Sequence, residues 1–385
     1  MIRKSRNVGA VWGIGGAALT GLLWLAPSSA QAGNKVILDV PNLAKVEADG
    51  AAKQLIITAA QPGKVPVEYS IWHKDGYVQS EAGGWATEEL KAAVKKESFP
   101  AGKTFIVTVG RYKNTASAVC RETSGVVQCA ALKATAANDT ILTAPGVGKA
   151  TVNGTTRKMT ITASKPATMA VEYTLWHSGG YAQGEVGGSA GAAATAEVEF
   201  PHYATFIVTI GHGNNVVSAI CRENDGQTGC ALALKRPEGE SIFDVTGFGK
   251  VAADTTVKEL TFMAFAPNQG SADVAEDGAA RQQDQKGDGV GAKPAKETPP
   301  ATPPSGPSRG DKKGDKISLD YSVWSADLYK QAVLAGAVVK GGKPIVRKEP
   351  LPQYKTFIVT IGNRGKIAAA ICREKGGKIG CTLVQ

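Results

Sequence analysis

One block of sequence occurs three times in this chain of 385 residues. Each copy begins with Thr-Phe-Ile-Val-Thr and ends with Cys-Arg-Glu-x-x-Gly-x-x-x-Cys. The six cysteines of the protein all belong to these blocks, as the pairs Cys120 and Cys129, Cys221 and Cys230, and Cys372 and Cys381. The chain must therefore form the same local structure three times.

The spacing inside each block predicts a β-hairpin closed by a disulfide. The midpoint between the cysteines falls on an x-Gly dipeptide, Asp225-Gly226 in the second copy, which is typical of a two-residue hairpin turn. Counting outward from this turn places Cys221 opposite Cys230 in a non-hydrogen-bonded pair, with Cα atoms about 4.5 Å apart, as a disulfide allows. Three pairs of free thiols and a metal site are the alternatives. A closed zinc site needs four ligands, and no histidines recur beside these cysteines, so we expect neither metal nor cofactor.

The N-terminus predicts export. Three cations precede an apolar run over residues 8–25, and Ala30-Gln31-Ala32 presents small residues to a signal peptidase. We interpret residues 1–32 as a cleaved signal peptide; an uncleaved membrane anchor is the alternative. No later apolar run is long enough to span a membrane. A periplasmic, cell-surface or secreted location would also supply the oxidising conditions that paired cysteines require.

Positive charge is concentrated at the C-terminal end. The chain carries a net charge of +10, and three of these charges lie in the first 32 residues. Residues 309–385 contain 15 Lys or Arg and six Asp or Glu, so their balance is +9. Such a segment favours anionic partners such as acidic glycans or lipid headgroups, although a solvated lysine-rich surface has the same composition.

The repeats divide the chain into three β-modules, which we place at residues 33–134, 135–237 and 238–385. Each contains about seven short strands, among them an alternating run such as Val67–His73. We therefore predict an all-β protein of three tandem β-sandwiches of immunoglobulin-like architecture, each closed by its disulfide hairpin. Three small β-barrels are the alternative.

The third module contains an insert at residues 268–316. It is rich in Gln, Asp, Lys, Gly and Pro, a composition that predicts a disordered loop. In the first module the equivalent place holds only a short turn. Lengthening a loop between neighbouring strands costs on the order of 0.6 kcal/mol per doubling, so the insert does not preclude the fold.

Aromatic residues and arginines recur at equivalent places and are the candidate binding residues. We expect the tryptophans Trp72, Trp176 and Trp324 in the core, because a tryptophan on a central strand usually packs there. Tyrosines five residues further on are candidates for ligand binding at the surface: Tyr77, Tyr181 and Tyr329. The arginines after the first cysteines lie opposite a glycine in two copies, which would leave them room to reach outward to a ligand: Arg121, Arg222 and Arg373. We expect each arginine to form a surface ion pair with the glutamate that follows it.

Catalytic signals are weak. Gly187-Gly-Ser-Ala-Gly191 fits the Gly-x-Ser-x-Gly pattern around a hydrolase nucleophile, Ser189, but that motif needs a strand before it and a helix after it. It is also absent from the other two copies. His73 and His177 are equivalent, yet Ser325 takes their place in the third module, which favours packing or hydrogen bonding over catalysis. We do not expect an enzyme.

The sequence favours an exported, non-enzymatic binding or structural protein of the cell envelope or extracellular space. Its three modules would give avidity for an anionic polysaccharide or another envelope component. One alternative is a secreted protein that binds or inhibits a protein partner through its disulfide hairpins; a further alternative is a hydrolase that uses Ser189. We expect no nucleic-acid partner.

Overall fold

The computed structural model describes residues 35–84, 93–123, 125–134, 140–233, 241–245, 248–265, 315–338, 343–363 and 366–384. The predicted signal peptide and residues 268–314 of the predicted insert lie outside these ranges. The described residues form 27 β-strands and no helix, so nothing in them could span a membrane as a helix.

Each module contains nine strands in the same order. Module 1 comprises β1 (Lys35–Val40), β2 (Ala44–Asp49), β3 (Gln54–Ala59), β4 (Val67–His73), β5 (Gly76–Ala82), β6 (Val94–Ser98), β7 (Thr104–Arg111), β8 (Asn114–Thr123) and β9 (Val126–Ala134). Module 2 comprises β10 (Thr140–Ala144), β11 (Gly148–Asn153), β12 (Lys158–Ala163), β13 (Ala170–His177), β14 (Gly180–Gly187), β15 (Thr195–Glu199), β16 (Thr205–His212), β17 (Asn215–Asn224) and β18 (Gln227–Ala233). Module 3 comprises β19 (Ser241–Val245), β20 (Gly249–Asp254), β21 (Glu259–Ala264), β22 (Asp315–Ser325), β23 (Tyr329–Val338), β24 (Ile345–Pro350), β25 (Thr356–Asn363), β26 (Lys366–Lys375) and β27 (Lys378–Val384).

The strands of each module form a sandwich of two antiparallel sheets. In module 1 an outer sheet has the order β1-β2-β3-β6, and an inner sheet has the order β5-β4-β7-β8-β9. Strands β2, β3 and β6 thus correspond to A, B and E of the immunoglobulin plan, and β4, β7 and β8 to C, F and G. The predicted fold class is confirmed.

Two strands more than expected are present in each module. The sequence signal of β2 is weak because its inward positions are Ala44, Val46 and Ala48, two of which are small. Strand β6 has the sequence Val-Lys-Lys-Glu-Ser and buries no residue, so hydrophobic periodicity could not reveal it.

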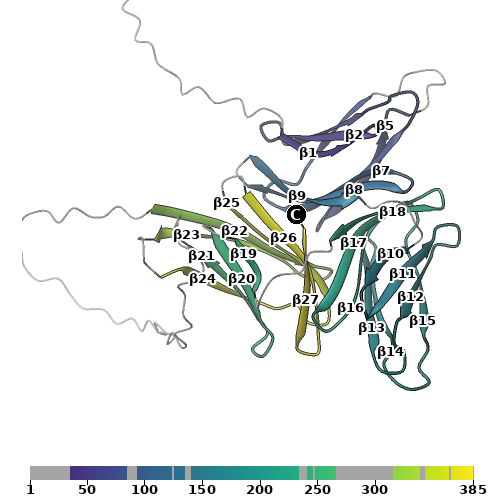
Figure 1. Ribbon diagram of the computed structural model, residues 1–385. Helices are drawn as coiled ribbons and strands as arrows, with labels where there is room; N and C mark the ends of the chain where they lie inside the picture. Colours follow the sequence, from purple (N-terminus) through teal and green to yellow (C-terminus); the bar gives the residue numbers. More distant parts are fainter. Residues whose placement is uncertain are drawn as a thin grey trace, which may run out of the picture.

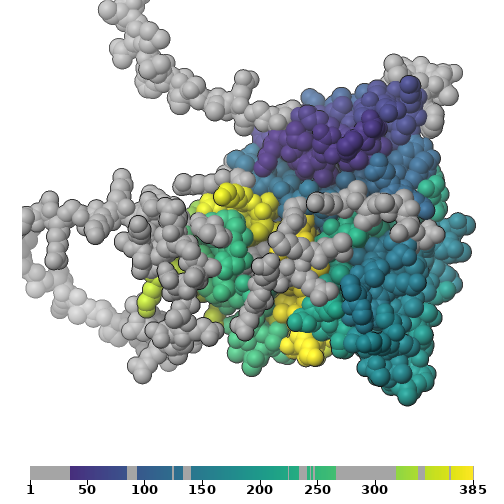
Figure 2. Space-filling view, in the orientation of Figure 1, coloured from purple at the N-terminus to yellow at the C-terminus, as the bar shows by residue number. Residues whose placement is uncertain are grey.

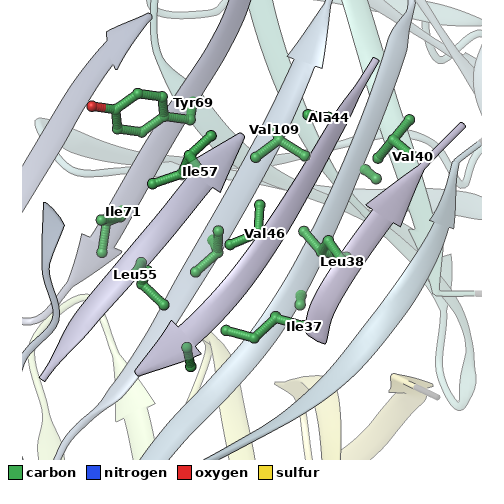
Figure 3. Close-up of a cluster of buried hydrophobic side chains, with 14 of the residues drawn as sticks. Ile37, Leu38, Val40, Ala44, Val46, Leu55, Ile57, Tyr69, Ile71 and Val109 are labelled. Atoms are coloured by element: carbon green, nitrogen blue, oxygen red, sulfur yellow. The ribbon is translucent and has the colours of Figure 1, made fainter. Parts of the chain in front are cut away.

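A separate hydrophobic core fills each sandwich. Alternation directs Leu55 and Ile57 of β3 and Tyr69 and Ile71 of β4 into the space between the two sheets of module 1, as Figure 3 shows. These four side chains are almost completely buried. Modules 2 and 3 have equivalent clusters.

The hairpin in each repeated block has the register that the sequence predicts. Asp225 and Gly226 have φ values of 46° and 74°, as the two-residue turn requires, and Cys221 pairs with Cys230. All three disulfides form, with Cα atoms 4.0–4.1 Å apart. The described residues contain no free cysteine.

The three sandwiches surround a common centre, with their inner sheets facing it (Figure 1). Strands β9 and β18 pair, which joins the inner sheets of modules 1 and 2 into one sheet of ten strands. A fourth hydrophobic core, with residues from all three inner sheets, fills the centre. The modules pack into one body, which Figure 2 shows in space-filling form, and do not form a string of separate domains.

The insert lies between β21 and β22, the equivalents of β3 and β4. Its predicted C-terminal end needs a small correction, since Asp315 and Lys316 already belong to β22. Strand β22 extends further toward the insert than β4 does, and it pairs with β23 over the whole ten-residue length of that strand.

Candidate functional site: the junctions between modules

The second face of each inner sheet forms contacts with the neighbouring modules. On β4, Glu68, Ser70 and Trp72 alternate with the core residues and therefore face away from the sandwich. We call the contacts of modules 1 and 2, of 2 and 3, and of 3 and 1 the first, second and third junctions. Equivalent residues meet at each, so the body has approximate threefold symmetry.

Three tryptophans meet at the centre. The ring centroids of Trp72, Trp176 and Trp324 lie 5.0, 5.1 and 5.2 Å apart, and each pair is in an edge-to-face arrangement. The side chains are only 1–3% exposed. The prediction that they are buried is confirmed, but they lie in the core between modules and not between the two sheets of one module. We call this group the tryptophan triad.

The tyrosines that follow the tryptophans reach across the junctions. At the first junction the Tyr77 hydroxyl accepts a hydrogen bond of 2.9 Å from the main-chain N–H of Thr205, whose hydroxyl lies 2.6 Å from that of Ser70. The Tyr181 hydroxyl accepts equivalently from the N–H of Thr356 at the second junction, at 2.9 Å.

The third junction closes the ring. There the Tyr329 hydroxyl accepts from the N–H of Thr104 at 2.8 Å. All three tyrosines are half-buried, with their hydroxyls already engaged. They hold the modules together, and ligand binding by them remains an untested prediction.

The arginines of the repeated blocks are buried at the same junctions, so the expectation that they reach outward is wrong. Arg222 is 5% exposed and its Nε lies 3.3 Å from Glu68 Oε2 across the first junction. Arg373 is 4% exposed, and its Nη1 lies 2.9 Å from Glu172 Oε2 across the second. Burial raises the pKa of Glu68, although the neighbouring Arg222 opposes this shift.

The third junction departs from this pattern. Arg121 is 5% exposed and forms no ion pair with any described residue, and its Nε and Nη1 have no hydrogen-bond partner. The facing acid is Asp320, one methylene shorter than the glutamates of the other junctions. Burial lowers the pKa of the Arg121 guanidinium, and Asp320 opposes this shift.

The glycines opposite Arg222 and Arg373 allow the neighbouring module to approach closely. A Cβ on Gly229 would lie 2.1 Å from Thr115 Oγ1 of module 1, and one on Gly380 would lie 2.3 Å from Val216 Cγ2 of module 2. Gln128 holds the equivalent place at the third junction. Glycine is therefore required where the modules approach most closely, and it does not provide an exit for the arginine.

The glutamates of the repeated blocks secure the hairpin turns. Glu223 is fully buried, and its carboxylate accepts hydrogen bonds from the N–H groups of Gly226, at 2.9 Å, and Tyr203, at 2.7 Å. Glu374 accepts equivalently from Gly377 and Tyr354. The expectation that each arginine forms a surface ion pair with the adjacent glutamate is therefore wrong. The sequence did contain a signal for this role, because each glutamate stands three residues before the turn glycine whose N–H it accepts from.

An open cleft of about 250 Å³ lies at the second junction. It is lined by Gln183, Gly184, Glu185, Tyr354, Arg373 and Lys375. The buried Nε of Arg373 has no hydrogen-bond partner, and the contact of its Nη1 with Glu172 lacks hydrogen-bond geometry.

Three further side chains around this cleft supply an aromatic ring, a cation and an anion. The Tyr354 ring is 54% exposed, and Lys375 forms an ion pair with the 56% exposed Glu185. Hydrogen bonding to Lys375 lowers the pKa of Glu185. The cleft thus combines an aromatic face with donors and acceptors for a polar ligand.

The other junctions lack this combination. The first junction has Asn224 at the position equivalent to Lys375. The third junction has Thr123 at that position and Gly102 at the position equivalent to Tyr354. Because the chemistry differs at each junction, the chain does not provide three equal sites. Among the described residues, this combination of side chains is present at the second junction alone.

The catalytic alternative lacks its structural setting. Ser189 is exposed in the loop after β14, and the next element is strand β15 where a nucleophile elbow requires a helix. His177 Nδ1 instead accepts a hydrogen bond from the N–H of Gly179 at 3.1 Å, and Ser325 Oγ accepts equivalently from Leu328. The predicted hydrogen-bonding role of this position is confirmed.

Comparisons with known proteins name no relative. No protein-family model and no curated protein matches the sequence. Among solved structures, the FN1-FN3 domains of chicken CNTN1 align at 10% identity over 92% of this chain and 98% of theirs, with a TM-score of 0.12. A marsupial T cell receptor aligns at 10% identity over 88% of this chain and 97% of the receptor chain, with a TM-score of 0.15. Dimeric latent PorU from Porphyromonas gingivalis aligns at 9% identity over 91% of this chain and 32% of the PorU chain, with a TM-score of 0.16.

These scores are too low to support conclusions about module arrangement or function. The assignment of the fold rests on strand order, since each module shows the two-sheet plan of an immunoglobulin-like domain. An all-β fold with three disulfides fits an extracellular binding or structural protein.

Proposed function

We propose that the protein is an exported, non-enzymatic binding protein that holds an acidic sugar residue of an anionic glycan in the cleft at the second junction. The observation that carries this proposal is the guanidinium of Arg373, which is buried with an unpartnered Nε and lines an open cleft together with Gln183 and Lys375. A buried polar group without a partner is costly, and a ligand oxygen would remove that cost.

The side chains around Arg373 suit a sugar ring with a carboxylate. The exposed face of Tyr354 offers a surface for ring stacking, and the Gln183 amide can donate and accept hydrogen bonds. Lys375 supplies a second cation, at present paired with Glu185. In this proposal the ligand carboxylate takes the place of Glu185 at Lys375, and the exposed glutamate moves into solvent.

This arrangement changes the expected role of triplication. Avidity from three equal sites would require the tyrosines and arginines of every module to be free, but these residues hold the modules together. The repeats instead build a single body, in which the second junction has acquired its own lysine and exposed tyrosine. Binding of the oligosaccharide in this cleft should accordingly saturate at one ligand per chain.

Calorimetry at low salt with an oligosaccharide of uronic acid units tests the proposal. Lys375→Thr and Tyr354→Gly reproduce the residues of module 1, Thr123 and Gly102, and should each weaken binding about tenfold, the effect of losing about 1.4 kcal/mol. Glu185→Gln should tighten binding, because it removes the competing carboxylate.

Tyr203→Gly is the matched control. It makes the same change at the first junction, where Tyr203 is also exposed but no lysine accompanies it, and it should leave binding unchanged. Failure of any acidic oligosaccharide to bind, or equal affinity of Lys375→Thr and the parent, would exclude this site.

One observation favours the second candidate, a protein partner bound by a disulfide hairpin. The tips of the first two hairpins approach turns of their own outer sheets, since a Cβ on Gly50 or Gly154 would meet the tip carbonyl at 1.8 or 1.9 Å. The third tip, Gly376-Gly377, has open space around it. Cross-linking in the native envelope through a probe at the third tip should then capture one stoichiometric protein, and a probe at the second tip should not.

A further inference from the structure

A second pocket lies where the tryptophan triad opens to the surface, and it is separate from the cleft at the second junction. Its volume is about 300 Å³, and all three modules contribute to its lining. The turns β4–β5, β13–β14 and β22–β23 surround the opening and place Lys74, Ser178 and Asp327 beside the three indoles. We call this the axial pocket.

The three turns around the axial pocket carry side chains of different size. The residue two positions after the tryptophan is Lys74 in module 1 but Ser178 and Ala326 in modules 2 and 3. Gly180, which also lines the pocket, packs against His177, and a Cβ there would lie 3.2 Å from the imidazole Nε2. The smaller residues Ser178 and Ala326 therefore leave space over the tryptophan triad, and the long side chain of Lys74 places one cation at the edge of this space.

Hydrogen-bond donors are left without protein partners at this place. None of the three triad indole N–H groups donates to another described residue, and none is fully enclosed, so each keeps contact with solvent. The pocket is an opening that all three indoles line. Tryptophan N–H groups usually find an acceptor, and an indole can only donate.

The charge balance of the pocket favours an anion. Asp327 is already paired with Lys355, at 2.5 Å, and the Lys355 ammonium also lies over the Tyr181 ring, 5.1 Å from its centroid. Among the described residues Lys74 forms no ion pair, and the neighbouring Asp75, whose pKa it helps to lower, is already paired with Lys103. A ligand oxyanion could neutralise Lys74 while accepting hydrogen bonds from indole N–H groups and the Ser178 hydroxyl.

We propose that the axial pocket binds the carboxylate, sulfate or phosphate group of a small organic anion, in contact with the tryptophan triad. The free ion and the same group on a larger molecule share this chemistry, and the volume favours the latter, since an isolated ion would leave most of the space to water. The site needs all three modules in place, so its ligand would also stabilise the assembled body.

Intrinsic fluorescence tests the proposal, because the triad lies at the site. Trp12 and Trp24 fall in the predicted signal peptide, so a Trp85→Phe background leaves only the triad in the exported chain. Titration with inorganic phosphate, sulfate, glucuronate and uncharged glucose at constant ionic strength should give a saturable fluorescence change with the anions alone. Tighter binding of glucuronate than of the inorganic ions would identify an organic anion as the ligand.

Variants assign the response to this pocket. Lys74→Gln should weaken the fluorescence response at least fivefold and Ala326→Leu should abolish it, with unchanged near-ultraviolet circular dichroism showing that the triad is intact. Lys149→Gln, on the exposed side of β11, is the charge-matched control and should have no effect. Lys375→Thr, which tests the cleft at the second junction, should also leave this response unchanged. A response that does not saturate, or that is equal in Lys74→Gln and the parent, would overturn the proposal.

Discussion

The close approach of Gly380 to module 2 gives the sharpest test of how the modules are held together. An alanine at Gly380 would place its methyl group 2.3 Å from Val216 Cγ2 and 2.9 Å from the carbonyl oxygen of Gly213. Carbon atoms in good contact lie about 3.5–4.0 Å apart, so the second junction must open by more than 1 Å to accept Gly380→Ala. Opening it would also separate Arg373 from Glu172.

The magnitude follows from the cost of overpacking. Adding a methyl group to a tightly packed interior usually costs about 1–3 kcal/mol. Replacing glycine also restricts the unfolded chain, which offsets about 0.4–1 kcal/mol of that cost. Because the clash involves main chain as well as a side chain, we expect the upper part of the net range, so that Gly380→Ala lowers the free energy of unfolding by about 1–2.5 kcal/mol. Gly229→Ala should act similarly at the first junction.

Urea unfolding followed by tryptophan fluorescence measures the effect, since the triad reports on all three junctions. Gln128→Ala is the control at the equivalent position of the third junction, where a side chain is already accommodated, and it introduces no overlap. Val216→Ala should cost less in the Gly380→Ala background than in the parent. A Gly380→Ala protein as stable as the parent would refute the close approach of β27 to module 2.

Other features of the structure give three further predictions. Burial lowers the pKa of His177 below its ordinary value of 6.5, so the unfolded chain binds the proton more readily and stability should fall as the pH drops below about 6.5. His177→Ser, which places in module 2 the residue that module 3 has at Ser325, should reduce this loss when urea unfolding is compared at pH 7.5 and 5.5. Trp324→Ala should cost about 3–5 kcal/mol and remove the near-ultraviolet dichroism of the triad. Replacing Cys221 and Cys230 together by Ala should cost about 2.5–3 kcal/mol in the same assay, because a loop of about ten residues is no longer closed in the unfolded chain.

The repeated hairpin could be predicted in detail because its determinants are local. A two-residue turn at Asp225-Gly226 fixes the register of every pair beyond it, including that of Cys221 with Cys230. The alternation of β4 likewise separates Tyr69 on one face from Trp72 on the other. Neither inference needs knowledge of any contact with another module.

The partners of the second face could not be predicted in this way. A tyrosine or arginine that alternates away from a core has the same sequence pattern whether solvent or another protein surface covers it. Arg222 was therefore expected at a free surface, although it pairs with Glu68, 154 residues away in the chain. Only the packing of the inner sheets reveals that this surface is covered.

The differences among the junctions were visible as residues but not as chemistry. Asp320 in place of a glutamate and Lys375 in place of an asparagine could be read from an alignment of the three repeats. The first substitution leaves Arg121 without an ion pair among the described residues, and the second adds a cation to an open cleft. Both effects depend on where the neighbouring module lies.

By itself, the sequence determined most of the strands, the hairpin turns, the disulfides and the threefold repetition, because each depends on residues close together in the chain. The tertiary structure decided that the three modules form one body around the tryptophan triad, and that the tyrosines and arginines hold this body together. These contacts depend on the fit of complementary faces more than 100 residues apart, and the alternation of side chains along one strand contains no information about that fit.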